Sequence, residues 1–203
     1  MSIGGKVALQ MSSVHTIGII CEDETDFQSL KILISRIVNK TNLSYKKRIG
    51  EGCSKIKSKG LKWSDELYKQ GCDLLVVVHD RDREDYESLS RLLQSKFSTS
   101  LFTNRYVCIP VEEIEAWFLA DPQGISNLFK LDRQPKISSI PENINAPKEY
   151  LRDQVSQCSN GRKSYLNTIH NAKLSEVVAI DQIKTKSKSF EQLHNFLVAQ
   201  SYH

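Results

Sequence analysis

The sequence predicts an α/β fold with a mostly parallel sheet flanked by helices, followed by a helical C-terminal extension. Short apolar runs alternate with segments of helical periodicity over residues 14–128. The run from Asp73 to His79 is apolar without interruption, as in strands that are covered on both faces. Beyond Leu128, three prolines and further helical stretches replace this alternation. We therefore expect a core over 14–128 and an extension over 129–203 that packs on it.

Composition and length agree with one soluble globular unit. The 203 residues carry a net charge of +4, with 39% hydrophobic and 26% charged residues, which argues against disorder and low complexity. No run approaches 18 apolar residues, and residues 1–10 lack the apolar segment of a secretory signal. The five cysteines form no C-x-x-C pair, so disulfides and a zinc knuckle are not expected. We expect a cytoplasmic protein without a membrane segment.

The first elements follow from local patterns. Residues 14–21 are β-branched and apolar, which predicts a buried strand. Phe27, Leu30 and Ile34 recur at helical spacing, which predicts a helix over 26–39. Residues 40–62 hold eight Lys or Arg and three glycines, so we expect a strand and a surface loop there.

The later elements continue the alternation. A short helix is expected over 63–70, the central strand over 73–79 and a helix over 84–96. The next strand and helix are expected over 106–111 and 112–120. In the extension, helical patterns cover 148–158, 163–180 and 189–199.

The acidic residues are clustered. Residues 22–26, 80–87 and 112–121 contain 13 of the 24 acids, and each cluster follows a predicted strand. These clusters sum to a charge of about −11, so the other residues carry about +15. The sequence thus predicts three acidic spots within a basic body.

The acidic spots are expected to converge, because ligands of open α/β sheets bind at the carboxyl ends of the strands. Carboxylates repel each other, and gathering several raises their pKa values or calls for a cation. Oxygen donors without His or Cys suit Mg2+ or Mn2+. Acids are also common in first helical turns, where they complement the helix dipole. That alternative explains Glu22 and Asp80 less well, and we predict a metal site formed by Glu22, Asp80 and Asp82 together.

The order of these motifs carries a resemblance. The segments Ile17–Glu22 and Leu74–Asp82 resemble the Toprim arrangement of topoisomerases, primases and OLD-type nucleases, in which a strand ends in Glu and a later strand in Asp-x-Asp. Further segments resemble a Toprim-like family of unknown function whose members often occur beside AAA-type ATPases in prokaryotic defence loci: Glu22–Asp26, Val111–Asp121, Ala146-Pro-Lys and Ser189–Leu193. The resemblance spans most of residues 16–198.

The resemblance implies roles for the acids. Glu22 would act as general acid or base or hold a second ion, and Asp80 and Asp82 would hold Mg2+. Glu115 would complete the site, with Asp26 and Glu112 as secondary candidates. One departure is that Toprim turns usually have Gly after the Glu, where this chain has Asp23. Either this turn does not need a positive φ, or a second carboxylate stands at the site.

Two residues of the extension are weaker candidates. Lys163 and His170 lie where the resembling family tends to carry a polar motif, and could contact a substrate phosphate. The alternative for both is an ordinary helix surface.

These observations lead to the hypothesis of a Mg2+- or Mn2+-dependent nuclease that cleaves or nicks DNA or RNA, in a phage-defence context. Basic residues between the first two acidic clusters would bind the polyanion: Lys46, Lys47, Arg48, Lys55 and Lys57. The alternative is a non-catalytic subunit that binds an AAA-type ATPase partner or nucleic acid. The sequence also leaves a homodimer open.

Overall fold

A parallel four-stranded sheet forms the centre of the molecule. The computed structural model describes residues 13–202, so the segment 1–10, on which the expectation of no secretory signal rested, lies outside the described residues. The strands lie in the order β2-β1-β3-β4, with the bounds β1 (Thr16–Cys21), β2 (Ser44–Ile49), β3 (Leu74–Val78) and β4 (Arg105–Cys108). The α/β class expected from the sequence is confirmed.

The register brings the carboxyl ends of the strands to one level. Ile20 lies opposite Val77 in the β1–β3 pair, and Val78 lies opposite Cys108 in the β3–β4 pair. The chain after each strand therefore emerges at the same edge of the sheet. This is the edge at which the three acidic clusters follow their strands.

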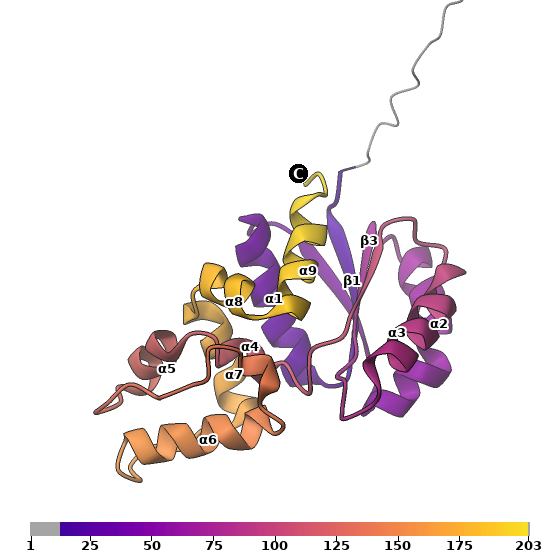
Figure 1. Cartoon of the computed structure of the whole chain (residues 1–203). Coiled ribbons are helices and arrows are strands. Elements are labelled where there is room, and N and C mark those ends of the chain that lie inside the picture. Colours follow the sequence, from indigo (N-terminus) through magenta and orange to yellow (C-terminus); the bar gives the residue numbers. More distant parts are fainter. Residues whose placement is uncertain (1–12, 203) are drawn as a thin grey trace, which may run out of the picture.

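Helices cover both faces of the sheet. On one face lie α2 (Cys53–Lys69) and α3 (Tyr86–Ser98), and on the other lies α1 (Glu24–Val38). Figure 1 shows α1 and the last helix on the side of the sheet opposite α2 and α3. The strands alternate accordingly, since Ile19 and Val76 belong to the core beneath α1, whereas Ile20 and Val77 belong to the core beneath α2 and α3. Burial on both faces accounts for the uninterrupted apolar sequence of β3.

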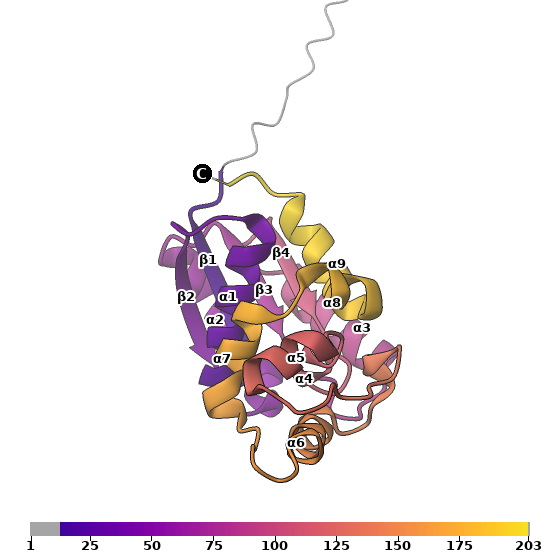
Figure 2. The same cartoon turned by 90° about the vertical axis from the view of Figure 1, so that its left-hand side faces the viewer.

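The C-terminal region is helical, as the sequence predicts. Figures 1 and 2 show it mainly on the side of the sheet where α1 lies, toward the carboxyl end of the strands. Its elements are α4 (Glu115–Phe118), α5 (Pro122–Phe129), the 3₁₀ turn η1 (Pro141–Asn143), α6 (Pro147–Cys158), α7 (Asn167–Val177), α8 (Ile180–Lys186) and α9 (Lys188–Val198). Side chains of this region belong to the same hydrophobic core as β1 and α1. The indole Nε1 of Trp117 also donates to Ser189 Oγ at 2.8 Å.

Two predicted elements differ from the structure. Residues 53–62, expected as a loop, form the first half of α2, and Gly60 lies inside that helix against the ring of Phe97. Glycine disfavours the interior of a helix, but at Gly60 the absent side chain permits a close helix–helix contact. The helix expected over 112–120 is regular only from Glu115 to Phe118, because Glu112 adopts a left-handed backbone with φ of 62°.

No helix within residues 13–202 has the length and apolar character needed to span a membrane.

Candidate metal and active site

The turn after β1 positions the first acidic cluster. Asp23 caps α1, because its side chain accepts a hydrogen bond from the backbone N–H of Asp26 at 2.9 Å. Asp23 itself is extended, with φ of −139°. The turn therefore does not need a residue with positive φ at this position. This agrees with the first of the two explanations for the missing glycine.

The turn after β3 has an uncommon backbone. Asp82 and Arg83 both have positive φ, at 47° and 61°, a conformation that costs non-glycine residues free energy. The backbone N–H of Arg83 donates to Glu112 Oε2 at 3.2 Å, and Arg81 N–H donates to the Pro110 carbonyl at 3.2 Å. These contacts join the second acidic cluster to the third.

Glu115 is fixed by a buried polar network. It is only 3% exposed, and its Oε1 accepts hydrogen bonds from Tyr165 Oη at 2.9 Å and Asn171 Nδ2 at 3.0 Å. The Tyr165 hydroxyl also contacts Asn171 Oδ1. The extension therefore orients a carboxylate that belongs to the strand-end clusters.

These turns enclose a cavity of about 140 Å³ at the carboxyl edge of the sheet. It is lined by Glu22, Asp23, Asp26, Asp80, Asp82, Glu112, Glu113, Glu115, Lys148 and Asn167. The structure thus brings together all four predicted principal residues, together with the secondary candidates Asp26 and Glu112. Eight carboxyl groups and a single cation line this cavity.

The cavity disfavours full ionisation of its acids. Burial, followed by the charges of Asp26, Glu22 and Glu115, raises the pKa of Asp80 well above its usual value. Burial and the charge of Asp23 likewise raise the pKa of Asp26. A proton or a cation must compensate charge in this cavity at neutral pH.

The donor set fits a hard divalent cation. Asp80 Oδ1 is buried and has no hydrogen-bond partner among residues 13–202, which is uncommon for a buried oxygen. Glu22, Asp82 and Asp80 face the same cavity and offer carboxylate oxygens, the ligands of Mg2+ and Mn2+. The unsatisfied oxygen is the observation that favours an ion over simple helix capping.

Lys148 and Asn167 were not predicted from the sequence. Lys148 is the second residue of α6, and its backbone N–H and its Nζ donate to Glu113 at 3.2 and 3.3 Å. Burial lowers the pKa of Lys148, but the charges of Glu115 and Glu113 outweigh this and leave the pKa raised. A charged ammonium group therefore lies beside the carboxylates. The Ala-Pro-Lys motif was the available signal for it.

Cys53 is a second unpredicted neighbour of the site. The tight connection after β2 places it there, since Gly50 N–H donates to the Cys21 carbonyl at 2.8 Å and Glu51 N–H to the Glu22 carbonyl at 2.7 Å. The Cys53 thiol donates to Glu22 Oε1 and lies 3.5 Å from His79 Nδ1. Burial and this hydrogen bond to Glu22 raise the pKa of Cys53, so the group is a neutral thiol.

Comparison with protein families gives one match. The model of a family described as a domain of unknown function (DUF4276) matches residues 21–198. The chain belongs to this family. Searches of curated proteins and of solved structures found no match. Family membership carries no activity with it, so the Toprim relationship stays a proposal. The match does include every residue that lines the cavity.

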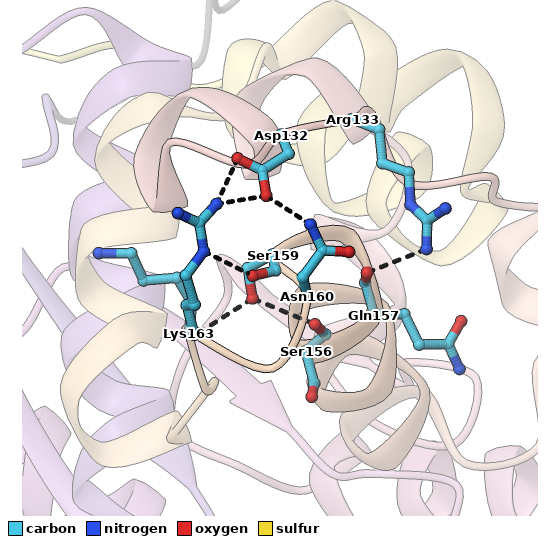
Figure 3. A network of polar contacts seen from close by, with 8 residues as sticks. Asp132, Arg133, Ser156, Gln157, Ser159, Asn160 and Lys163 are labelled. Carbon is cyan, nitrogen blue, oxygen red and sulfur yellow. Dashed lines mark hydrogen bonds and ion pairs between the residues drawn. The ribbon is translucent and has the colours of Figure 1, made fainter.

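The weaker candidates of the family's C-terminal part lie outside the cavity lining. Lys163 ends a turn whose contacts are shown in Figure 3: its N–H donates to Ser159 Oγ at 2.9 Å, and Arg162 pairs with Asp132. The His170 ring contacts the Phe129 ring in a tilted arrangement, with centroids 4.8 Å apart and an interplanar angle of 46°. These contacts favour the structural alternative for both residues.

The predicted basic residues are engaged by neighbouring groups. Lys47 contacts Glu24, Arg48 contacts Glu66 at 3.0 Å, and Lys46 donates to the Gln70 carbonyl. On α2, Lys55 contacts Glu51 and Lys57 contacts Glu84. Partly exposed ion pairs of this kind are weak and exchange readily, so these side chains stay available to a polyanion.

Proposed function

We propose that the protein is a Mg2+- or Mn2+-dependent nuclease that cleaves phosphodiester bonds of DNA or RNA. The observation that carries the proposal is the cavity at the carboxyl edge of the sheet, with eight carboxyl groups and the unpartnered Asp80 Oδ1. The order of Glu22, Asp80 and Asp82 along the chain, each after its strand, supports the Toprim resemblance. A cytoplasmic location is part of the same proposal.

Three side chains would hold the ion, namely Glu22, Asp80 and Asp82. A bound divalent ion would supply neutralisation of the scissile phosphate and orientation of the attacking water. Asp80 would be the principal ligand, because its Oδ1 is buried and has no hydrogen-bond partner among residues 13–202. Asp82 is exposed, so it reaches the cavity from the solvent side.

Lys148 would contact the substrate phosphate. Lys148 is in the first turn of α6, and its Nζ donates to Glu113. This contact fixes the position of the ammonium group and leaves it charged. The backbone of the first turn of α6 adds partial positive charge in the same place. Together these groups would stabilise the charge that develops on the phosphate oxygens.

Glu22 and Asp26 are the groups suited to proton transfer. Asp26 is nearly buried, and burial, followed by the charges of Asp23 and Glu115, raises its pKa, which favours the protonated form. Glu22 is partly exposed and adjoins both Asp80 and the solvent. Its carboxylate could accept a proton from the attacking water.

The test compares purified wild type, Glu22→Gln and Asp80→Ala on single-stranded and duplex DNA and RNA with Mg2+, Mn2+ or EDTA. The proposal expects metal-dependent cleavage that both variants lose by about a hundredfold or more, while Asp153→Asn, on the exposed face of α6, retains it. If the protein cleaves none of these substrates, either alone or together with an ATPase partner, the proposal is refuted.

A second candidate is a non-catalytic subunit that binds an AAA-type ATPase or nucleic acid. The specific observation in its favour is that the Cys53 thiol donates to Glu22, which engages a carboxylate that the enzyme would need. In this case a complex would form with wild type and with Asp80→Ala equally. Equal complex formation together with absent cleavage would favour the subunit over the enzyme.

A further inference from the structure

The proposed chemistry leaves one cluster beside the carboxylates unused. Glu22, Cys53 and His79 bring a carboxylate oxygen, a thiol sulfur and an imidazole nitrogen within 4.8 Å of one another. They come from three separate elements, namely the ends of β1 and β3 and the first residue of α2. Such a donor set differs in kind from the oxygen-only set across the cavity.

Backbone hydrogen bonds of the fold hold the three donor residues in place. The short connection between β2 and α2 is tied to the end of β1 by the Gly50 and Glu51 backbone hydrogen bonds, which fixes Cys53 against Glu22. His79 is fully buried, and its backbone N–H donates to the Cys108 carbonyl at 3.1 Å. The three donors are therefore held by backbone contacts.

His79 has a free ring nitrogen. Its Nδ1 lies 2.7 Å from the Asp80 carbonyl and 3.5 Å from Cys53 Sγ. Its Nε2 is buried with no hydrogen-bond partner among residues 13–202. Nδ1 therefore donates to the Asp80 carbonyl, and metal binding at Nδ1 requires the ring proton to move to Nε2 and the Asp80 carbonyl to turn away from Nδ1.

Sulfur and imidazole donors select a different class of ion. Mg2+ takes oxygen ligands, whereas Zn2+ and Co2+ bind thiolate, imidazole and carboxylate together. Three protein ligands leave a fourth position of a tetrahedral ion open to water or an anion. The ion would bind the Cys53 sulfur in place of the thiol proton, which would pass to solvent. The hydrogen bond from Cys53 to Glu22 would then be lost, and both side chains would bind the ion instead.

We propose that Glu22, Cys53 and His79 form a site for a thiophilic divalent cation such as Zn2+, next to the carboxylate site and sharing Glu22 with it. Binding there engages Glu22 and so competes with its use toward Mg2+ or Mn2+. Binding itself does not depend on the nuclease proposal; the expected inhibition of cleavage by Zn2+ rests on it.

The experiment uses Co2+ as the probe, because a cobalt–thiolate bond gives a charge-transfer absorption in the near ultraviolet. Wild-type protein is expected to show this band at a ratio of one Co2+ per chain, and one equivalent of Zn2+ should remove it. Cys53→Ser should lack the band and bind Zn2+ more than about tenfold more weakly. Glu22→Gln should weaken binding and keep the band.

The matched control is Cys158→Ser, since Cys158 is likewise a free cysteine and lies at the far end of α6. It should leave the band unchanged. Far-ultraviolet circular dichroism checks that Cys53→Ser is folded. A wild type without the band, or a band that persists in Cys53→Ser, would overturn the proposal. In the cleavage assay, Zn2+ should inhibit wild type and spare Cys53→Ser.

Discussion

Replacing Asp80 with Asn is expected to stabilise the metal-free protein. The cavity of about 140 Å³ is lined by eight carboxyl groups, so several carboxylates surround one small volume. Two unit charges about 6 Å apart repel by about 3 kcal/mol at the effective dielectric constant of a protein surface. Asn keeps the shape of the side chain and removes its charge, and partial protonation already relieves part of the repulsion. We therefore expect a gain of about 2 kcal/mol.

The assay is thermal unfolding in EDTA, followed by circular dichroism. A gain of about 2 kcal/mol corresponds to a rise in Tm of about 4 to 8 °C for a chain of this length. Asp153→Asn serves as the control, because Asp153 is exposed and lies outside the cavity lining. Its Tm should change by little.

The gain should depend on pH. The pKa of Asp80 is raised in the folded state, so between the unfolded and folded pKa values the folded chain binds more protons. Stability of wild type therefore falls as pH rises through this window. The stability difference between Asp80→Asn and wild type should therefore grow as pH rises from the unfolded pKa of Asp80 through its folded pKa. A variant that is less stable than wild type, or equally stable, at the alkaline end of this titration would refute the argument that this cavity stores carboxylate repulsion.

Three further predictions address other parts of the account. Lys148→Met should reduce cleavage about a hundredfold, measured by initial rates, and should lower Tm, because the carboxylates of the cavity lose the cation beside them; unchanged rates would remove Lys148 from the site. Tyr165→Phe should lower the free energy of unfolding by about 1 to 3 kcal/mol in denaturant titrations, since Glu115 and Asn171 lose a buried partner; no loss would mean that the network is not stabilising. Gly60→Ala should also destabilise by about 1 to 3 kcal/mol, because the new Cβ would lie 2.7 Å from the Phe97 ring, whereas Ser58→Ala on the exposed side should not.

The architecture was predictable because its signals are local and agree with one another. The apolar run of β3 indicates a strand that is covered on both faces. The acids after β1 and β3 lie at the carboxyl ends of these strands. Those two facts, with parallel pairing, place Glu22 near Asp80 before any coordinates are known. The same reasoning correctly gathered Asp82 and Glu115.

The parts that were missed depend on contacts distant in sequence. Gly60 resembles a helix breaker until the Phe97 ring is seen against it. Lys148 looks like any basic residue after a proline, and only its approach to Glu113 shows its place. Cys53 lies 31 residues from Glu22, and its proximity follows from the backbone ties after β2. Single residues of these types carry no periodic signal.

The central claim is that the acidic cavity binds a divalent cation, and a crystal soaked in Mn2+ tests it most directly. The account predicts an anomalous difference peak between Glu22, Asp80 and Asp82 in wild type, and its loss in Asp80→Asn. Wild-type crystals that show no such peak at saturating Mn2+, with the three carboxylates ordered in the map, would contradict the account.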